Sequence, residues 1–323
     1  MSIQKMIKAI KNNIEMNHPI LLPYLLMIQR RSIKPVCDWP LEKAIAGDMK
    51  SYKRHMGYTF DINNPILFTE KLQWYKFFYH RDDFSQITDK FLFKQYISQQ
   101  LGEGYTIPVY NSWTRVDDLE KDWHSLPEEF VLKANLQSDG RNIKIIHKKS
   151  DIIFSKIKNT LKAWLDKRNT LANSWDYNFY RGTPRILAEK YMENLADQLF
   201  DYKFFCFNGE PYCMYVAQEH FDKGNYPISF YDLHWNRLDV RYGGHLVGDA
   251  PRPAHFDEMI EISKRLSKGF PFVRVDFFDT DEKLYVAELT FAPGGGVTPY
   301  HPRSFNEKLG ELFVLPEKNS KSV

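Results

Sequence analysis

The pattern of hydrophobic and polar positions predicts a helical first part followed by alternating helices and strands. Apolar residues recur at helical spacing in some segments and alternate, or run together over strand lengths, in others. The predicted helices span residues 68–78, opened by Thr69 as its cap, 89–100, 151–172 and 256–268. The predicted strands span 106–110, 130–134, 142–146, 185–191, 202–207, 212–218 and the hairpin 272–278/284–290. This order favours an α+β fold of two lobes with a cleft between them.

Composition places the chain among folded proteins. Its 323 residues are 43% apolar and 26% charged, with a formal charge of +3. The three cysteines (Cys37, Cys206 and Cys213) form no CxxC pair, which excludes a zinc ribbon and a disulfide framework and favours the cytoplasm. Lysine and arginine are dispersed and the net charge is modest, so nucleic acid is not an expected partner.

The first 35 residues form a basic arm. They contain six Lys or Arg residues and one Glu, and the longest apolar run, 20–28, is too short to cross a bilayer. Either this arm is a solvated helical element, or it makes peripheral contact with an anionic membrane surface or acidic polymer. The second alternative places the protein in the cytoplasm at the inner face of the membrane.

The hairpin 272–290 carries the most informative polar residues. If Phe278 faces Leu284, Arg274 lies opposite Glu288, and alternation puts Arg274, Asp276, Glu288 and Thr290 on one face. Asp276 and Glu288 then become diagonal neighbours, a spacing that suits Mg²⁺ bound to phosphate oxygens. The alternative is a surface hairpin with an ordinary Arg–Glu pair.

Three further segments have weaker signals. Lys133 ends a strand before a small loop containing Gly140, whose backbone N–H groups can cradle phosphates; an edge hairpin is the alternative. The strand that leads into Glu189 and Lys190 can offer backbone groups to an adenine edge, and Asp201 can accept from ribose hydroxyls. Lys90 and Lys94 lie four apart on one predicted helical face, which is more often a solvated face than a phosphate site.

The order of these motifs resembles the ATP-grasp fold, and more narrowly its TupA-like branch, which is linked to teichuronopeptide and capsular polysaccharide synthesis. The phrases FVLKAN, RILAEKYMEN, DYKFFCFNGEP, FYDLHWNRL and AELTFAPGGG are similar to blocks of that branch, over residues of about 65 to 310. The resemblance implies a helical region over 1–80 with the basic arm. It also implies an ATP-grasp N-terminal lobe over 81–192, a C-terminal lobe with a metal site over 193–310, and a tail over 311–323.

The resemblance also implies roles for individual residues. ATP and Mg²⁺ are the implied cofactors. Phosphate contacts are implied for Lys94, Lys133, Ser138, Gly140 and, near the FYDLHWNRL block, Arg237 or Arg241. Adenine is assigned to Glu189, Lys190, Tyr191 and Met192, and ribose to Asp201. The metal is assigned to Asp276, Glu288 and Thr290, catalysis to Arg274 and Lys133, and the acceptor side to Gly294, Gly295 and Gly296.

Two departures from the family pattern bear on these roles. The phosphate loop keeps one glycine and adds Asp139, where the family has a glycine-richer loop, and this bears on how the loop closes. Thr290 stands at a metal position that is Asn in many ATP-grasp ligases, although the TupA-like branch shares the threonine.

The implied reaction is an ATP-dependent carboxylate–amine ligation through an acyl-phosphate. The branch implies a uronic-acid carboxylate on an acidic saccharide or nucleotide sugar as acceptor, and an amino acid as the amine. The alternatives are a phosphotransferase acting on a sugar hydroxyl with the same nucleotide site, and a non-catalytic nucleotide-binding module.

Overall fold

The structure is a computed structural model of the whole chain. It describes residues 40–136, 142–166, 182–192, 199–219, 226–280 and 282–319. The basic arm, Ser138 and Gly140 lie outside the described residues, so the predictions on them stay predictions.

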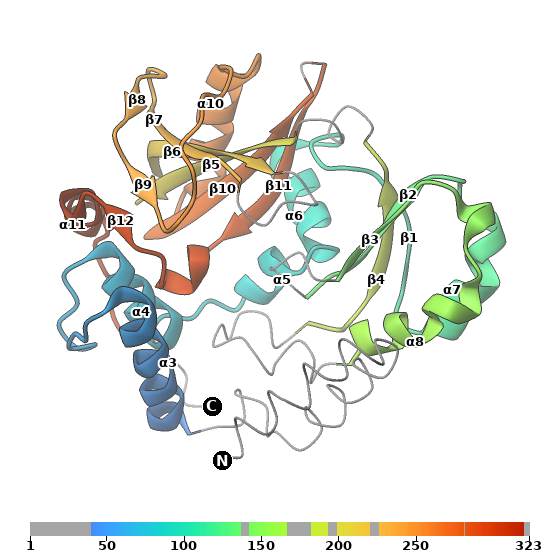
Figure 1. Cartoon of the computed structure of the whole chain (residues 1–323), viewed down its shortest axis with the longest axis horizontal. Helices are drawn as coiled ribbons and strands as arrows, with labels where there is room; N and C mark the ends of the chain where they lie inside the picture. Colours follow the sequence, from blue (N-terminus) through green and yellow to red (C-terminus); the bar gives the residue numbers. More distant parts are fainter. Residues whose placement is uncertain are drawn as a thin grey trace.

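Two antiparallel sheets dominate the described part of the chain (Figure 1). The helices are α3 (Leu41–Met56), α4 (Phe68–Phe78), α5 (Phe84–Thr88), α6 (Leu92–Leu101), α7 (Val116–Asp122), α8 (Phe154–Trp164), α10 (Phe256–Ser267) and α11 (Arg303–Leu312). The strands are β1 (Val109–Trp113), β2 (Phe130–Ala134), β3 (Ile143–Ile146), β4 (Ile186–Lys190), β5 (Leu199–Phe207), β6 (Glu210–Glu219), β7 (Ile228–Asp232), β8 (Arg237–Leu238), β9 (Arg241–Tyr242), β10 (Phe272–Asp279), β11 (Leu284–Thr290) and β12 (Tyr300–His301). Short 3₁₀ turns lie at Trp123–Ser125, Lys149–Asp151 and Pro293–Gly296.

The smaller sheet has the strand order β1-β4-β2-β3. One of its faces is covered by α7 and α8 (Figure 1). Phe130 and Leu132 of β2 are fully buried there against Leu161 of α8. Because alternate residues of β2 point to opposite faces, Lys133 is directed away from this core.

The larger sheet has the order β11-β10-β5-β6-β7-β8 and a core rich in phenylalanine. The amphipathic helix α10 packs against β5, β6 and β10. Phe204, Phe256 and Phe277 are completely buried on that side. The Asn208–Gly209 turn between β5 and β6 has positive φ at both residues, a conformation typical of a tight hairpin.

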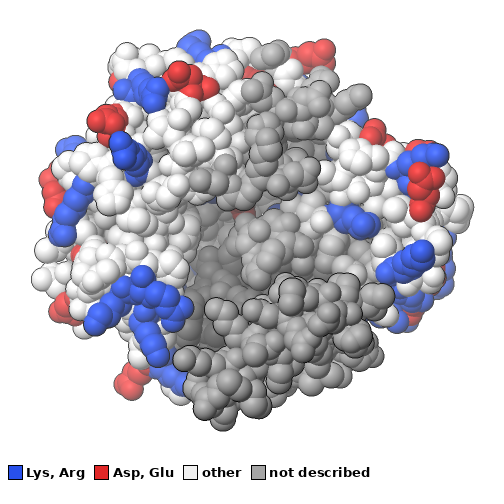
Figure 2. Space-filling view, in the orientation of Figure 1, with Lys and Arg blue, Asp and Glu red and all other residues white. Residues whose placement is uncertain are grey.

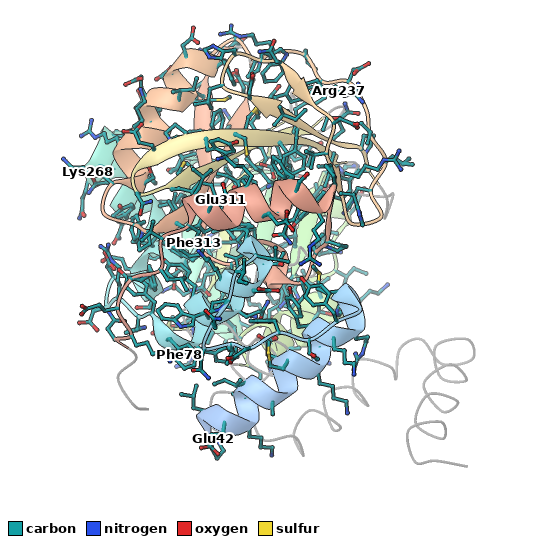
Figure 3. The ribbon with its side chains drawn as sticks, turned by 90° about the vertical axis from the view of Figure 1, so that its left-hand side faces the viewer. Glu42, Phe78, Arg237, Lys268, Glu311 and Phe313 are labelled. Atoms are coloured by element: carbon teal, nitrogen blue, oxygen red, sulfur yellow. The ribbon has the colours of Figure 1, made fainter. Side chains whose placement is uncertain are left out.

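Helix α4 lies between α3 and α11 (Figure 3). The sequence predicted an amphipathic helix here, but ten of its eleven residues are buried. Gly310 of α11 explains part of this burial, since a Cβ atom there would come within 2.4 Å of the Ile66 carbonyl oxygen. The close approach of α11 to the start of α4 therefore requires glycine.

Most predicted elements are confirmed, with small shifts at their ends. The helix predicted over 151–172 corresponds to α8, and its part beyond residue 166 lies outside the described residues. Helix 68–78 and strand 130–134 match the structure, whereas the strand predicted at 106–110 begins at Val109 and runs to Trp113. Pro108 has no N–H to donate, which accounts for the later start. Thr69 is not the cap of α4, because the helix begins at Phe68 and its N-cap is Leu67. The Glu70 carboxylate accepts the N–H groups of Ile66 and Leu67 at this end.

The predicted division at residues 80, 192 and 310 stays a prediction. Helices α5 and α6, assigned to the first lobe, bury Phe84, Ile87, Phe93 and Ile97 in the core of the larger sheet. None of the helices in the described ranges is long and apolar enough to cross a membrane.

Candidate active site

The register of the β10–β11 hairpin differs from the prediction at two places: Leu284 pairs with Asp279 rather than with Phe278, and a bulge follows. Arg274 pairs with Thr290 and Asp276 lies directly opposite Glu288, but Ala287 has no Cα partner and forms a bulge. Because of the bulge, the four polar residues of the hairpin still lie on one face of the sheet, as predicted. Arg274 is therefore not opposite Glu288, and the two carboxylates are direct rather than diagonal neighbours.

One row of side chains crosses four strands at this point. Asp276 of β10 pairs with Lys203 of β5 on its other side, and Lys203 pairs with Tyr215 of β6. Together with Glu288 on β11, the row runs tyrosine, lysine, aspartate, glutamate across the sheet. The sheet itself thus sets the spacing of these groups.

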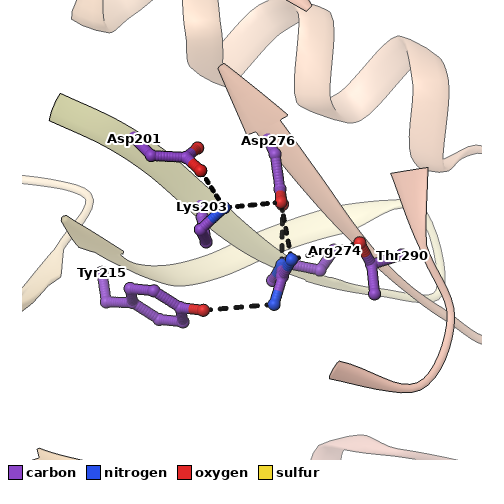
Figure 4. A network of polar contacts seen from close by, with 6 residues as sticks. All are labelled: Asp201, Lys203, Tyr215, Arg274, Asp276 and Thr290. Carbon is purple, nitrogen blue, oxygen red and sulfur yellow. Dashed lines mark hydrogen bonds and ion pairs between the residues drawn. The ribbon is translucent and has the colours of Figure 1, made fainter. Parts of the chain in front are cut away.

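Arg274 holds the neighbouring position and ties the row together (Figure 4). Its Nε donates to Asp276 Oδ1 at 2.7 Å and its Nη2 to Oδ2 at 2.6 Å, a bidentate pair. Further donations reach Tyr215 Oη and Thr290 Oγ1, each at 3.1 Å. Lys203 donates to Asp276 Oδ2 at 2.9 Å and also to Asp201. These six residues (Asp201, Lys203, Tyr215, Arg274, Asp276 and Thr290) are called the arginine network below.

The arginine network is buried, and its charges are matched. Asp276 is 1% exposed and Arg274 7% exposed. Burial by itself lowers the pKa of Lys203, but the charges of Asp201 and Asp276 outweigh it and raise that pKa. Burial likewise opposes the charge of Arg274, yet Asp276 raises its pKa well above the ordinary value. Both cations therefore stay charged at any physiological pH.

The residues predicted to hold Mg²⁺ are brought together, and they fit such an ion. Glu288 is half-buried and makes no hydrogen bond to another described residue, while Asp276 is already shared between Arg274 and Lys203. Within the described ranges there is no group of three or more His, Cys, Asp or Glu placed for a metal. One or two carboxylates, with the remaining ligands from phosphate and water, is the usual donor set for Mg²⁺. Glu288 would be the main protein ligand, and the role of Thr290 stays a prediction.

A second group of charges lies on the smaller sheet. Glu189 of β4 is 3% exposed and pairs with Lys94 of α6, at 2.8 Å between Nζ and Oε1, and with Lys133 of β2. Burial by itself raises the pKa of Glu189, but Lys133 and Lys94 outweigh it and lower that pKa. Burial also lowers the pKa of Lys94. Glu189, Lys90, Lys94 and Lys133 are called the lysine cluster below.

Lys90 connects the two groups. Its ammonium group interacts electrostatically with Glu288 of the larger sheet and with Lys133 and Glu189 of the smaller sheet. Burial lowers the pKa of Lys90, as expected for a cation in a closed site. Lys90 lies in the turn before α6, so it does not share a helical face with Lys94 as predicted.

Asn135 fixes the turn that carries Lys90. Its side-chain amide donates to Asp89 Oδ2 at 2.6 Å and to the Thr183 carbonyl at 2.9 Å, and the backbone carbonyl of Asn135 accepts from the Lys90 N–H. Asp89 in turn accepts the N–H groups of Phe91 and Leu92. The end of β2 and the start of α6 are therefore held as one unit.

The residues that the resemblance assigns to the nucleoside are less closely grouped. The Glu189 carboxylate faces the two lysines, and the Lys190 N–H already donates to the Pro108 carbonyl at 2.9 Å. Tyr191 and Met192 follow the end of β4, and Asp201 lies in the arginine network. The adenine and ribose roles of these residues stay predictions.

Two predicted sites are not joined to the rest. Arg237 lies on β8, the edge strand farthest from β11, where it pairs with Asp249 at 2.6 Å (Figure 3). Its predicted phosphate contact has no support in the described geometry, because four strands separate β8 from β11. Arg241, the alternative, is exposed on β9.

The glycine run 294–296 approaches the protein's own side chains. All three residues have φ between 58° and 69°, a conformation that favours glycine. A Cβ atom at Gly294 would lie 2.6 Å from Tyr242 Oη, and one at Gly296 would lie 2.5 Å from Gln73 Nε2. The predicted close approach to an acceptor therefore has room at Gly295 alone of the three.

Sequence reasoning missed Lys203 and Tyr215. The spacing of two residues between Asp201 and Lys203 could have indicated that both side chains lie on one face of a strand. The other partner of Lys203, Asp276, is 73 residues away in the sequence. Only the pairing of β5 with β10 brings the two together, and one sequence does not give that pairing.

These features place a group of buried charges on each of the two main sheets, and comparison with known proteins gives the family. The model of the TupA-like ATP-grasp family matches residues 70–314. The chain belongs to this family. ATP-grasp proteins are as a class ATP-dependent ligases, so the matched family defines the chain's fold and coarse class.

Similar solved structures include several ATP-grasp enzymes. An ATP complex of D-alanine–D-alanine ligase from Bacillus anthracis is 16% identical, with a TM-score of 0.40, over 71% of this chain and 65% of that one. The N5-carboxyaminoimidazole ribonucleotide synthetase of Thermus thermophilus is 13% identical, with a TM-score of 0.36, over 64% and 45%. A biotin carboxylase domain from Hydrogenobacter thermophilus with MgADP is 15% identical, with a TM-score of 0.38, over 64% and 40%. The chain thus spans about half the length of these relatives, and no curated protein matches its sequence.

Proposed function

We propose that the protein is an ATP- and Mg²⁺-dependent carboxylate–amine ligase. The observation that carries this proposal is a pair of charged groups on the two sheets: Lys94 and Lys133 converge on Glu189 of the smaller sheet. On the larger sheet, Asp276 lies directly opposite Glu288, whose charge also interacts with Lys90. A nucleotide held by the lysine cluster would then direct its terminal phosphate toward Glu288 and the arginine network. Lys94 and Lys133 share the single carboxylate of Glu189, and two neighbouring ammonium groups suit an anionic phosphate chain.

The described residues divide the chemistry between the two sheets. Lys94 and Lys133 bind and neutralise phosphate oxygens, while Arg274 stabilises the charge on the phosphoryl group during transfer. Mg²⁺ bound at Glu288 would supply Lewis-acid stabilisation of the phosphate oxygens. In the first step, a substrate carboxylate oxygen attacks the terminal phosphorus of ATP, and ADP leaves. In the second step, an amine nitrogen attacks the acyl carbon and loses a proton, and phosphate departs with the former carboxylate oxygen.

The proposed substrates are a uronic-acid carboxylate on an acidic saccharide or nucleotide sugar, and an amino acid. The support is the block resemblance to a branch linked to teichuronopeptide and capsular polysaccharide synthesis. This assignment rests on family analogy more than on a pocket.

Trapping the acyl-phosphate tests the reaction class. With ATP, Mg²⁺, glucuronate and hydroxylamine but no amino acid, we expect a hydroxamate on the uronate carboxylate. Glucose, which lacks the carboxylate, is the matched control and should give none. A stable sugar phosphate would instead identify the phosphotransferase alternative. Nucleotide binding that raises the melting temperature without any ADP release would favour a binding module.

We also propose peripheral contact with an anionic membrane at its cytoplasmic face. Residues 1–56 contain ten Lys or Arg and four Asp or Glu, so they are basic although the chain is nearly neutral. In the described part, basic side chains gather over α3 (Figure 2). The exposed ones are Lys43, Lys50, Lys53 and Arg54. Replacing these four by Gln should weaken binding to phosphatidylglycerol vesicles at low salt; salt-independent binding would contradict the proposal.

A further inference from the structure

The 3₁₀ turn Pro293–Gly296 is held from one side by α4. Gln73 Nε2 donates to the carbonyl oxygens of Gly295 at 2.9 Å and Gly296 at 2.8 Å. Lys76 Nζ donates to the same Gly295 oxygen at 3.0 Å. Two side chains of one helix thus fix consecutive carbonyl groups of a segment that glycine otherwise leaves free to move.

Lys76 is itself fixed by α3. Its ammonium group pairs with Asp48 Oδ2 at 2.5 Å, and both side chains are almost completely buried. A buried pair of this kind gives little net stability, because removing both charges from water costs about as much as their attraction returns. An apolar pair would fill the same space but could not hold the Gly295 carbonyl. The pair is therefore better explained by placement of the turn than by stability.

The other side of the turn leads to Arg274. Because Gly294 has no Cβ, the hydroxyl of Tyr242 fits against it. The Tyr242 ring stacks on Tyr215, with centroids 5.6 Å apart and an interplanar angle of 30°. Tyr215 Oη accepts the hydrogen bond from Arg274 described above. A continuous set of contacts therefore runs from α3 to the arginine network.

We propose that Asp48, Gln73 and Lys76 are positioning residues for the reaction, acting through the Gly294–Gly296 turn and Tyr242 on Arg274. The inference rests on the proposed function, but it goes beyond it. Asp48 lies before residue 70, where the family match begins, so a helix outside the matched region becomes part of the catalytic unit. Displacement of the turn should impair phosphoryl transfer while nucleotide binding, which depends on the other sheet, is retained.

Helix α4 provides a matched control for this proposal. Lys71, five residues before Lys76, also donates to two backbone carbonyls, those of Gly310 at 2.8 Å and Phe313 at 2.9 Å. These acceptors belong to α11 and the segment after it. Lys71→Met therefore removes the same kind of contact from the same helix without touching the glycine turn.

The experiment compares the double variant Asp48→Asn/Lys76→Met with Lys71→Met and wild type. The double substitution leaves no uncompensated buried charge, so the chain should fold. We expect amide hydrogen exchange in residues 292–298 to accelerate at least tenfold, and kcat in the hydroxamate reaction to fall about tenfold with the KM for ATP unchanged. Lys71→Met should accelerate exchange in 303–313 and leave kcat unchanged.

Several results would overturn the proposal. In the double variant, the first is that neither the hydrogen exchange in 292–298 nor kcat changes. The second is that the exchange accelerates while kcat stays unchanged. The third is that Lys71→Met loses as much kcat as the double variant. If wild type gives no hydroxamate, the proposed function fails separately, and the exchange comparison still decides whether the pair holds the turn.

Discussion

The lysine cluster and the arginine network are built from the same kinds of charged residue but are balanced differently. The lysine cluster sets three lysines around one carboxylate, Glu189. The arginine network sets two cations against two carboxylates in a closed set of hydrogen bonds. The first region gathers ammonium groups around one buried carboxylate, an arrangement that suits an anionic ligand, while the second holds its groups in place before any ligand arrives. Glu288, without a described hydrogen-bond partner, stands between them.

The largest expected effect comes from breaking the balance of the arginine network. Asp276→Asn leaves the charges of Arg274 and Lys203 without their shared partner, so the free energy of unfolding should fall by about 3–5 kcal/mol. Urea denaturation measures this loss. Asp201→Asn, farther from Arg274, should cost clearly less; equal losses would contradict the central place given to Asp276.

Glu288→Gln should abolish most turnover without affecting the fold. Glu288 makes no hydrogen bond to another described residue, so only its electrostatic interaction with Lys90 is lost, and the free energy of unfolding should fall by no more than about 1 kcal/mol. Glu288 would be the main protein ligand of the Mg²⁺ that stabilises the transferring phosphate, so the substitution should lower kcat by about 10²–10³-fold. Glu282→Gln, an exposed carboxylate of the same hairpin, is the control. Retained turnover in Glu288→Gln would remove this residue from the mechanism.

Glu189→Gln should make the thermal stability of the protein depend more strongly on bound nucleotide. Without the carboxylate, Lys94 and Lys133 repel one another, and the melting temperature without ligand should fall. Phosphate then replaces the missing charge, so MgADP should raise the melting temperature of the variant more than that of wild type. Differential scanning calorimetry with and without MgADP compares the two. A smaller rise in the variant would indicate that Glu189 contacts the nucleotide directly.

The pH dependence of nucleotide affinity should show the smallest effect. Burial lowers the pKa of Lys94 below that of a free lysine, so its charge is lost at a lower pH as the solution becomes alkaline. Phosphate favours the protonated form, and affinity should therefore fall as pH rises through this lowered pKa. Isothermal titration of ADP from neutral to alkaline pH follows the change. Lys94→Arg should keep its affinity over the same range; an identical decline would assign the titration to another group.

Local patterns predicted the elements of the fold, whereas contacts between distant segments determined the details of the site. The strand 130–134 and helix 68–78 follow from alternation and helical spacing, which short segments contain. The bulge at Ala287 was not predicted, because one residue without a partner leaves the hydrophobic pattern of the sequence nearly unchanged. The hydroxyl of Thr69 bonds Tyr52 and Asn306, residues that no local pattern brings together.

The sequence singled out the carboxylates of the candidate site and Arg274, but not the residues that hold them in place. Lys203 and Tyr215 become neighbours of Asp276 only through the order β10-β5-β6. Arg237 shows the opposite case, since its block resembles the family while the structure places it on the far edge strand. Strand order, which a single sequence does not contain, accounts for both.

Transfer of a carboxylate oxygen to phosphate tests the central claim most directly. Glucuronate labelled with ¹⁸O in its carboxylate is incubated with ATP, Mg²⁺ and hydroxylamine, and the inorganic phosphate is analysed by mass spectrometry. If the two sheets together form an acyl-phosphate, each phosphate released should carry one ¹⁸O atom. Unlabelled phosphate, or label retained entirely in the sugar, would contradict the ligase mechanism.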